Sequence, residues 1–240
     1  MTLLLSVVAS GKGKGIDLKT VEFLNNAKLS GIWTNISDIH RSALTRARKK
    51  LGWTIFEATF KKSVSMAYNF LPVNDHSVLW HGKKVFAVDG SKFDLPATKA
   101  IREEFDPESG LEYEGKGHYP QCLVTTVYDV FRRIPVARSV AGLKSSEREE
   151  FKTLLPQIPQ DSVLLFDRGY PSYEMIHCLN NNYNGNFIFR CPATSTFPAV
   201  HEFIKSNKTE EIIQILPSDK FVKKTPYTQR KSLEAIKIRA

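Results

Sequence analysis

The chain has 240 residues, of which 42% are hydrophobic and 25% are charged. This composition is ordinary for a globular protein and excludes a globally disordered chain. No apolar run is long enough to cross a bilayer. The apolar residues 1–9 precede Lys12 and Lys14, whereas a secretory signal peptide has its basic residues first. We therefore expect a cytoplasmic protein of one large domain or two small ones.

The positive charge of the chain is concentrated near its start. The formal net charge is +9, with 34 Lys and Arg against 25 Asp and Glu. Residues 1–80 carry 11 Lys and Arg against 5 Asp and Glu, which is two thirds of the net excess. Such an excess favours a polyanionic partner, most commonly nucleic acid, although a basic protein without such a partner has the same composition.

The three cysteines do not indicate a metal site. Cys122, Cys178 and Cys191 form no CxxC pair, and their spacing fits neither a zinc ribbon nor a zinc finger. We expect each of them to be a free thiol in a reducing compartment.

The first 80 residues predict a small helical bundle. The spacing of apolar residues indicates helices over residues 18–28, 38–51 and 54–68, the first capped by Asp17 and the second by Ser37 or Asp38. We interpret residues 1–80 as a basic helical DNA-binding region and residues 81–240 as a second domain.

The second predicted helix is strongly basic. It carries Arg41, Arg46, Arg48, Lys49 and Lys50. Such a helix can be the recognition element of a helix-turn-helix motif, or a solvated face that only keeps the protein soluble. Contact with DNA phosphates requires only charge and reach, so it is the interpretation that the sequence favours.

Residues 81–240 predict a mixed α/β domain. Apolar and alternating runs indicate, in chain order, a strand (84–89), a turn (93–96), a helix (99–105), two hairpin strands (119–128 and 134–140), a helix capped by Ser146 (147–158), a strand (163–167), a helix (173–182), a strand (187–190) and a helix (198–205). This is the element order of an RNase H-like fold, whose first and fourth strands are neighbours. From about residue 206 the segments EIIQIL, KFVKK and EAIKIRA predict short β-strands.

Two of the predicted strands end in an aspartate followed by a small-residue turn. Asp89 follows an apolar run and precedes Gly90, and Asp167 follows a second apolar run and lies two residues before Gly169. Ligands bind at the carboxyl ends of the strands in open α/β sheets. Each aspartate alone could be an ordinary turn residue. Together, they predict two carboxylates at one edge of one sheet.

A pair of carboxylates suits phosphodiester chemistry with divalent cations. Two hard ions can stabilise both the attacking and the leaving oxygen of a phosphoryl group, and Mg²⁺ prefers carboxylate ligands. Nearby basic residues can contact the nucleic acid. Arg168 can reach a phosphate or pair with Asp167, and Lys116 and His118 lie in a glycine-flanked loop that can approach DNA or simply be solvated.

The two aspartate motifs, VFAVDGSKFDLP and SVLLFDRGYPSYEMIHCL, are joined by YPQCLVTTVYDVFRRIPV. In this order they resemble IS4-type DDE transposases, and the upstream segment ISDIHRSALTRARKKLGWTIFEATF resembles the helical segment before the catalytic domain of that family. The resemblance covers nearly the whole chain and implies an RNase H-like mixed sheet flanked by helices, preceded by a small basic helical bundle and followed by a β-rich insertion.

The resemblance also implies a function. Asp89 and Asp167 match the first and second catalytic acids, which use Mg²⁺ or Mn²⁺ to cleave and transfer DNA strands at insertion-sequence ends in cut-and-paste transposition. The expected partner is double-stranded DNA, bound by a homodimer in the bacterial cytoplasm and associated with the nucleoid.

One motif of that family is absent. The third acid of the family is a glutamate in a Tyr-x-x-Arg-x-x-x-Glu pattern after the insertion, and this sequence has no such pattern. We therefore expect an incomplete insertion, a missing last helix and a truncated transposase that binds DNA but cleaves it poorly. The alternatives are a non-catalytic DNA-binding protein or inhibitory transposase fragment, and a phosphohydrolase with Asp89 as its nucleophile.

Overall fold

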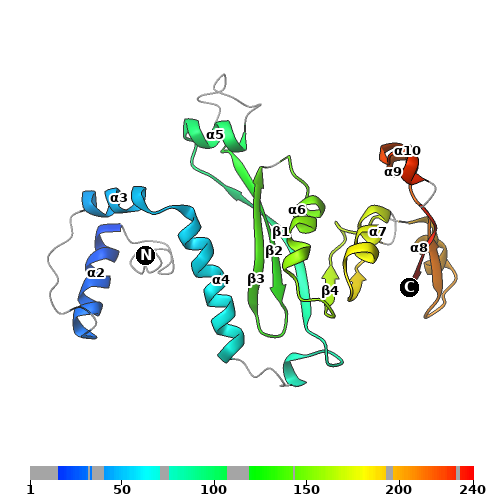
Figure 1. The fold of residues 1–240 in the computed structure, drawn as a ribbon, viewed down its shortest axis with the longest axis horizontal. Helices are drawn as coiled ribbons and strands as arrows, with labels where there is room; N and C mark the ends of the chain where they lie inside the picture. The colour runs from blue at the N-terminus through cyan, green and yellow to red at the C-terminus, as the bar shows by residue number, and fades with distance from the viewer. Residues whose placement is uncertain are drawn as a thin grey trace. The chain divides into compact units, whose positions relative to one another are not determined.

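The computed structural model describes residues 16–31, 33, 41–70, 76–106, 119–142, 144–192, 197–230 and 233–240 (Figure 1). The chain forms two compact units, Met1–Ser63 and Val64–Ala240, which we describe separately. Within the described residues, no helix combines the length and the apolar character that a transmembrane span requires. The three cysteines are free thiols, as predicted.

The first unit is helical, as the apolar spacing predicts. It contains helices α2 (Ile16–Leu29), α3 (Arg41–Lys50) and the start of α4 (Trp53–Phe70). The prediction that Asp17 caps the first helix is wrong, because Asp17 lies inside α2. The predicted caps Ser37 and Asp38 lie outside the described residues.

The second unit is built on a five-stranded mixed sheet with the strand order β3-β2-β1-β4-β5. The strands are β1 (Val85–Asp94), β2 (Gln121–Asp129), β3 (Ile134–Gly142), β4 (Val163–Phe166) and β5 (Asn186–Phe189). Strands β1, β2 and β3 form an antiparallel meander, whereas β4 is parallel to both β1 and β5. This topology is that of the RNase H-like fold, which confirms the predicted fold class.

Helices connect and cover these strands. They are α5 (Lys99–Phe105), α6 (Glu147–Leu154), α7 (Tyr173–Asn182) and α8 (Pro198–Lys205), each within one residue of a predicted helix start. Thr98, Ser146 and Ser172 cap the first three, because each side chain accepts a hydrogen bond from a backbone N–H of the first helical turn. Helix α6 packs against β1, β2 and β3 and forms part of the crossover to β4 (Figure 1).

The main core lies between helices α6 and α7 and the face of the sheet that α6 covers. Phe86 and Val88 of β1 and Phe166 of β4 are almost completely buried, and the α6 residues Phe151 and Leu154 pack among them. The rings of Phe151 and Phe166 meet edge to face with their centroids 4.9 Å apart. Burial of each such side chain stabilises the fold by about 1.5–3 kcal/mol.

Strand β1 is longer than its sequence predicts. The predicted turn over 93–96 is wrong for its first two residues, because β1 continues to Asp94 and pairs there with Gln121 of β2. Asp89 therefore lies in the middle of β1. On the other side of β1, the parallel pairing with β4 stops at Val88.

A second, smaller cluster forms around the C-terminal residues. Strands β6 (Ile212–Ile215) and β7 (Ile236–Arg239) pair in an antiparallel sheet, as EIIQIL and EAIKIRA predict. The predicted strand KFVKK is wrong, since these residues belong to helix α9 (Asp219–Lys224), which is followed by α10 (Tyr227–Arg230). Ser218 caps α9, so a local capping signal outweighs the weak β-propensity of the segment.

The core predicts a large difference between two Phe→Ala substitutions. Phe151 is completely buried, whereas Phe93 is 52% exposed. We expect Phe151→Ala to lower the free energy of unfolding by about 3–5 kcal/mol, because it leaves a cavity in the core. Phe93→Ala is the matched control and should change it by about 0.5 kcal/mol or less. Urea denaturation followed by circular dichroism measures both, and equal losses would contradict this description of the core.

Candidate functional site

Asp89 and Asp167 occupy matching positions on two neighbouring parallel strands. Val88 opposite Phe166 is the last pair between β1 and β4, and each aspartate is the next residue of its chain segment. Asp89 continues β1 just beyond this last pair, and Asp167 begins the turn after β4 there. Both residues are exposed. The structure thus places the two aspartates on adjacent segments, at the end of the β1–β4 pairing.

The end of β4 opens the sheet beside Asp89. On one side Asp89 is still paired with Thr126 of β2. On the other side β4 has ended, and a turn replaces it in which the backbone N–H of Tyr170 donates to the carbonyl oxygen of Asp167 at 3.1 Å. From Asp89 onward, β1 therefore no longer has β4 as its parallel neighbour. Solvent can reach the side chains of Asp89 and Asp167 there.

The carboxylate of Asp167 already has a cationic neighbour. Arg190 follows β5, and its Nη1 lies 3.7 Å from Oδ1 of Asp167, with both side chains more than half exposed. An exposed ion pair of this kind contributes little stability, about 0–1 kcal/mol. The sequence suggested Arg168 as a partner of Asp167, but in the structure the ion pair is made by Arg190, and Arg168 is exposed.

Another acid, Glu147, lies near the residues that follow the two aspartates. It is the first residue of α6, and its Cγ and Cδ are 2.4 Å from the position that a Cβ at Gly90 would take. Its Oε2 is 4.0 Å from the position of a Cβ at Gly169. The Glu147 side chain therefore contacts the residue after Asp89 and approaches the turn that follows Asp167.

Glu147 is not singled out by its sequence context. Ser146 and Glu149 match a capping box, and this local interpretation explains the acidic start of the helix without any site. The useful signal was its position at the start of the crossover helix, since that helix must return across the sheet toward β4. Only the packing of α6 on β1, β2 and β3 shows which strand residues Glu147 meets.

The next residue of α6 fixes the turn after Asp167. Nε of Arg148 donates a hydrogen bond of 2.9 Å to the carbonyl oxygen of Gly169. The first turn of α6 thus contacts both segments that carry the aspartates, through Glu147 at Gly90 and through Arg148 at Gly169. We infer that the N-terminus of α6 holds the two segments in register.

Tyr170 closes the site from the interior. Its side chain is 1% exposed, and its hydroxyl has no hydrogen bond of ordinary geometry. Burial raises the pKa of Tyr170 far above its usual range, and interaction with the nearby Glu147 carboxylate, followed by the charges of Asp89 and Asp167, raises it further. The hydroxyl is therefore protonated at neutral pH.

The donor set suits a hard divalent cation. Carboxylate oxygens are the ligands that Mg²⁺ and Mn²⁺ prefer, and such ions keep several waters, so few protein ligands suffice. Among the described residues, no three Asp, Glu, His or Cys side chains are arranged so that they could all hold one ion. The acids are thus neighbours of the right chemistry, and their side chains must converge for an ion to bind all of them.

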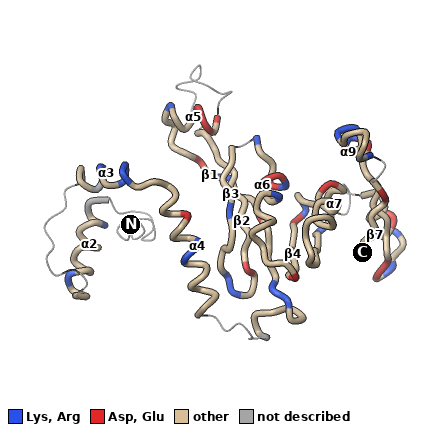
Figure 2. Tube along the Cα trace, in the orientation of Figure 1, with Lys and Arg blue, Asp and Glu red and all other residues tan. Residues whose placement is uncertain are grey.

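The predicted DNA-contacting residues lie in different parts of the chain. Arg46, Arg48, Lys49 and Lys50 are exposed on α3, where Figure 2 shows basic residues along the helix. The side chain of Arg41, and both Lys116 and His118, lie outside the described residues. Since α3 belongs to the first unit, its basic face is a separate feature from the acids.

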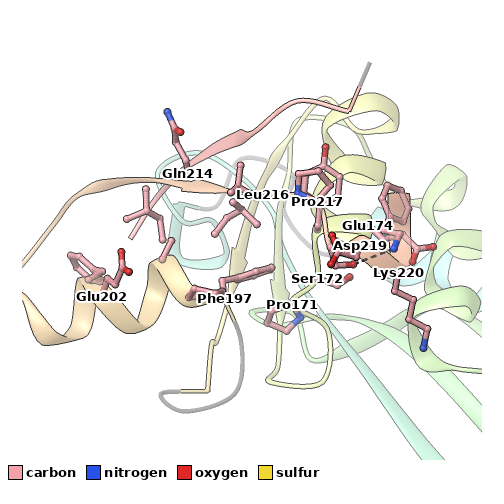
Figure 3. Close-up of a pocket in the computed structure, with 18 of the residues that line it drawn as sticks. Pro171, Ser172, Glu174, Phe197, Glu202, Gln214, Leu216, Pro217, Asp219 and Lys220 are labelled. Carbon is pink, nitrogen blue, oxygen red and sulfur yellow. Dashed lines mark hydrogen bonds between the residues drawn. The ribbon is translucent and has the colours of Figure 1, made fainter. Parts of the chain in front are cut away.

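A large open hollow, about 1220 Å³ in volume, lies beside the site. It is lined by the start of α7, by α8, by β6 and by the start of α9, with Phe197, Leu216 and Lys220 among the lining side chains (Figure 3). Neither Asp89 nor Asp167 lines it. Its only lining residue from α6 is Arg148, which also holds the turn after Asp167.

Comparisons with known proteins agree with one another. The profile of the family described as "Transposase DDE domain" matches residues 80–238. "Putative transposase InsZ" of Escherichia coli (strain K12) is 26% identical over 140 residues, which are 58% of this chain and 46% of that protein. "Transposase InsG for insertion sequence element IS4" of the same organism is 25% identical over 142 residues, 57% of this chain and 29% of that protein.

The alignments with these two relatives cover less than half of the length of either. Among solved structures, the piggyBac transposase synaptic complex with hairpin DNA aligns with 90% of this chain and 54% of that chain, with a TM-score of 0.36 and 9% sequence identity.

The contact between Glu147 and Gly90 predicts energetic coupling. Gly90→Ala should lower the free energy of unfolding by about 1 kcal/mol, because the added Cβ displaces the flexible Glu147 side chain. The loss should shrink by at least about 0.5 kcal/mol when Glu147 is already alanine, since the overlapping atoms are gone.

Urea denaturation of the single and double variants measures this coupling. Gly142→Ala is the matched control, because nothing lies within 4 Å of a Cβ at that position, and it should cause no loss. Strict additivity of Gly90→Ala and Glu147→Ala would show that the two residues do not touch.

Proposed function

The chain belongs to the transposase DDE domain family, whose profile covers residues 80–238. We propose that it carries the DNA-cleaving site of an IS4-type transposase. The proposed reaction is metal-dependent cleavage and transfer of DNA strands at insertion-sequence ends, with Asp89 and Asp167 as the first two catalytic acids. The observation that carries the proposal is their position, one residue beyond the last β1–β4 pair on adjacent parallel strands.

Asp89 and Asp167 would hold the divalent ions that transposases of the DDE type use, here Mg²⁺ or Mn²⁺. When bound, such ions supply Lewis-acid stabilisation of the charge that develops on the phosphate. Strand β1 presents Asp89 directly after the buried Val88, and the turn held by Arg148 presents Asp167. The Asp167–Arg190 ion pair has to open for Asp167 to bind an ion.

Two exposed guanidinium groups support a phosphate-binding role for the same edge. Arg168 follows Asp167 directly, and Arg190 already lies within 3.7 Å of the Asp167 carboxylate. An Arg190 side chain that turned away from Asp167 could bind a phosphate oxygen. Guanidinium groups bind phosphate with two parallel hydrogen bonds, so they can orient the scissile group as well as attract it.

The basic face of α3 is the proposed site of DNA attachment. Its cationic residues are exposed and follow one another closely, and contact with phosphates needs no special side-chain geometry. The domain boundary near residue 80, the homodimer on two double-stranded DNA ends and the association with the bacterial nucleoid remain predictions from the family resemblance.

A second candidate function is DNA binding without catalysis. It is favoured by the arrangement of the acids, since no three potential ligands among the described residues are placed to hold one ion, and Asp167 is paired with Arg190. In this case the 240-residue chain would occupy insertion-sequence ends, or associate with a longer transposase and inhibit it.

The proposal predicts a specific loss of DNA cleavage. With Mg²⁺ or Mn²⁺ and an excess of protein, we expect slow nicking of a supercoiled plasmid that carries the insertion-sequence ends. Asp89→Asn and Asp167→Asn should each reduce the nicking rate by a factor on the order of 100 or more, because the charge that binds the ions is lost. DNA affinity, measured in gel-shift titrations, should change less than about twofold.

Asp94→Asn is the matched control for this experiment. Asp94 lies on the same strand, is exposed and accepts a hydrogen bond from Gln121, so its loss should leave the nicking rate unchanged. Nicking that persists in Asp89→Asn would refute the catalytic proposal. Tight DNA binding by a parent chain that never nicks would favour the second candidate.

The basic helix predicts a salt-dependent loss of DNA affinity. Changing Arg46, Arg48, Lys49 and Lys50 together to Gln should weaken binding to any DNA sequence and lower the slope of log Kd against log salt concentration by up to about 0.9 for each lost phosphate contact. Fluorescence anisotropy over a range of salt concentrations measures both. Lys208→Gln is the control, because Lys208 pairs with Glu211. An unchanged slope in the α3 variant would exclude α3 from the DNA interface.

A further inference from the structure

The C-terminal residues are a second concentration of positive charge in the chain. Residues 217–240 carry seven Lys and Arg against two Asp and Glu, whereas residues 81–216 carry 16 against 18. The whole positive excess that follows residue 80 therefore lies in this last segment. Figure 2 shows basic residues gathered at α9.

Three of these cations, Lys220, Lys223 and Lys224, belong to α9 and are exposed; we call them the α9 surface. Arg239, by contrast, pairs with Glu210. Within the part of the chain that the structure describes, no acid forms an ion pair with the three lysines of α9. Their charge is therefore available to a polyanionic partner.

The spacing of these lysines suits a regular row of phosphates. Lys220 and Lys224 are four residues apart, which places them on one side of α9 and about 6 Å apart along its axis. Successive phosphates of one DNA strand are about 3.4 Å apart along the duplex axis, so the two lysines can contact different phosphates. Such contacts need charge and reach, and no base-specific geometry.

Helix α9 is held in place by contacts at both of its ends. Phe221 packs against Tyr173 of α7, with the two ring centroids 5.4 Å apart. At the other end, Arg230 donates hydrogen bonds from Nε to the carbonyl oxygen of Thr225 at 2.9 Å and from Nη2 to that of Lys223 at 3.0 Å. These bonds satisfy carbonyl groups at the end of α9 and join it to α10. The lysines therefore extend from an ordered element.

One hollow connects the α9 surface with the turn that follows Asp167. Its volume is about 1220 Å³, and its lining includes Pro171 and Ser172 from that turn and Lys220 and Lys224 from α9 (Figure 3). Acidic residues line it as well, so the lysines of α9, rather than the hollow as a whole, offer a contact to DNA. A DNA strand that leaves the Asp167 segment along this hollow would meet these lysines.

We propose that the α9 surface is a second DNA-binding surface, which contacts the phosphates of duplex DNA independently of base sequence. It is distinct from the basic face of α3, which belongs to the first unit. The inference rests on the proposed function, because the family to which the chain belongs identifies DNA as the polyanion. If the lysines only keep the protein soluble, their removal leaves DNA affinity unchanged.

Salt-dependent DNA binding tests this inference. Fluorescence anisotropy of a labelled duplex, titrated with the 240-residue chain, gives the Kd at several salt concentrations. We expect Lys220→Gln and Lys224→Gln together to weaken binding on the order of tenfold and to lower the slope of log Kd against log salt concentration by up to about 0.9 for each lost contact. Lys83→Gln with Lys208→Gln is the matched control, because it removes the same charge from two lysines that already pair with acids. It should change the Kd less than about twofold.

Two duplexes and the α3 variant make the result decisive. A duplex that carries insertion-sequence ends and an unrelated duplex of the same length should lose affinity to the same extent, and a loss on only one would contradict contact with phosphates alone. Urea denaturation should give the Lys220 and Lys224 double variant the stability of the parent, because both side chains are exposed.

An unchanged salt slope in the double variant would refute this inference. A reduced slope in the α3 variant would then show that the DNA attachment of the proposed function stands without the α9 surface. If the parent chain binds neither duplex, the DNA-binding part of the proposed function fails as well.

Discussion

The parallel pairing of β1 with β4 is the constraint on which the candidate site depends. It fixes the register at Val88 opposite Phe166, and Asp89 and Asp167 are the next residues of the two segments. The pairing is held by burial, because Phe86, Val88 and Phe166 all lie in the main core. The exposed acids contribute nothing to this arrangement. The buried residues that stabilise the pairing, Val88 and Phe166, are thus each followed directly by one of the two proposed catalytic aspartates.

Helix α6 has a comparable division between a structural end and a functional end. Toward its C-terminus, Phe151 and Leu154 pack into the core and hold the helix on the sheet. At its N-terminus, Glu147 and Arg148 reach the two segments that carry the aspartates. A parallel β-pair requires a crossover connection, and here the crossover returns next to the strand ends that it joins. The topology therefore supplies both acidic strands and a third element to hold them.

Much of this fold follows from local patterns in the sequence, and the exceptions have physical causes. The apolar runs before Asp89 and Asp167 identify the two central strands, and serine caps locate α6 and α7. The extension of β1 beyond Asp89 depends on its long pairing with β2, which no local pattern specifies. Glu147 was missed for the same reason, because its neighbours are distant in sequence and its own turn is explained by capping.

The charges around the site suggest why it would respond to an ion. Asp89 and Asp167 carry negative charge on adjacent segments, and the buried Tyr170 hydroxyl interacts with the Glu147 carboxylate nearby. Arg190 offsets part of the negative charge at Asp167, but from an exposed position where solvent screens the interaction. Asp89 and Asp167 would hold a divalent cation at this edge of the sheet, and the exposed Arg190 beside them would attract a phosphate.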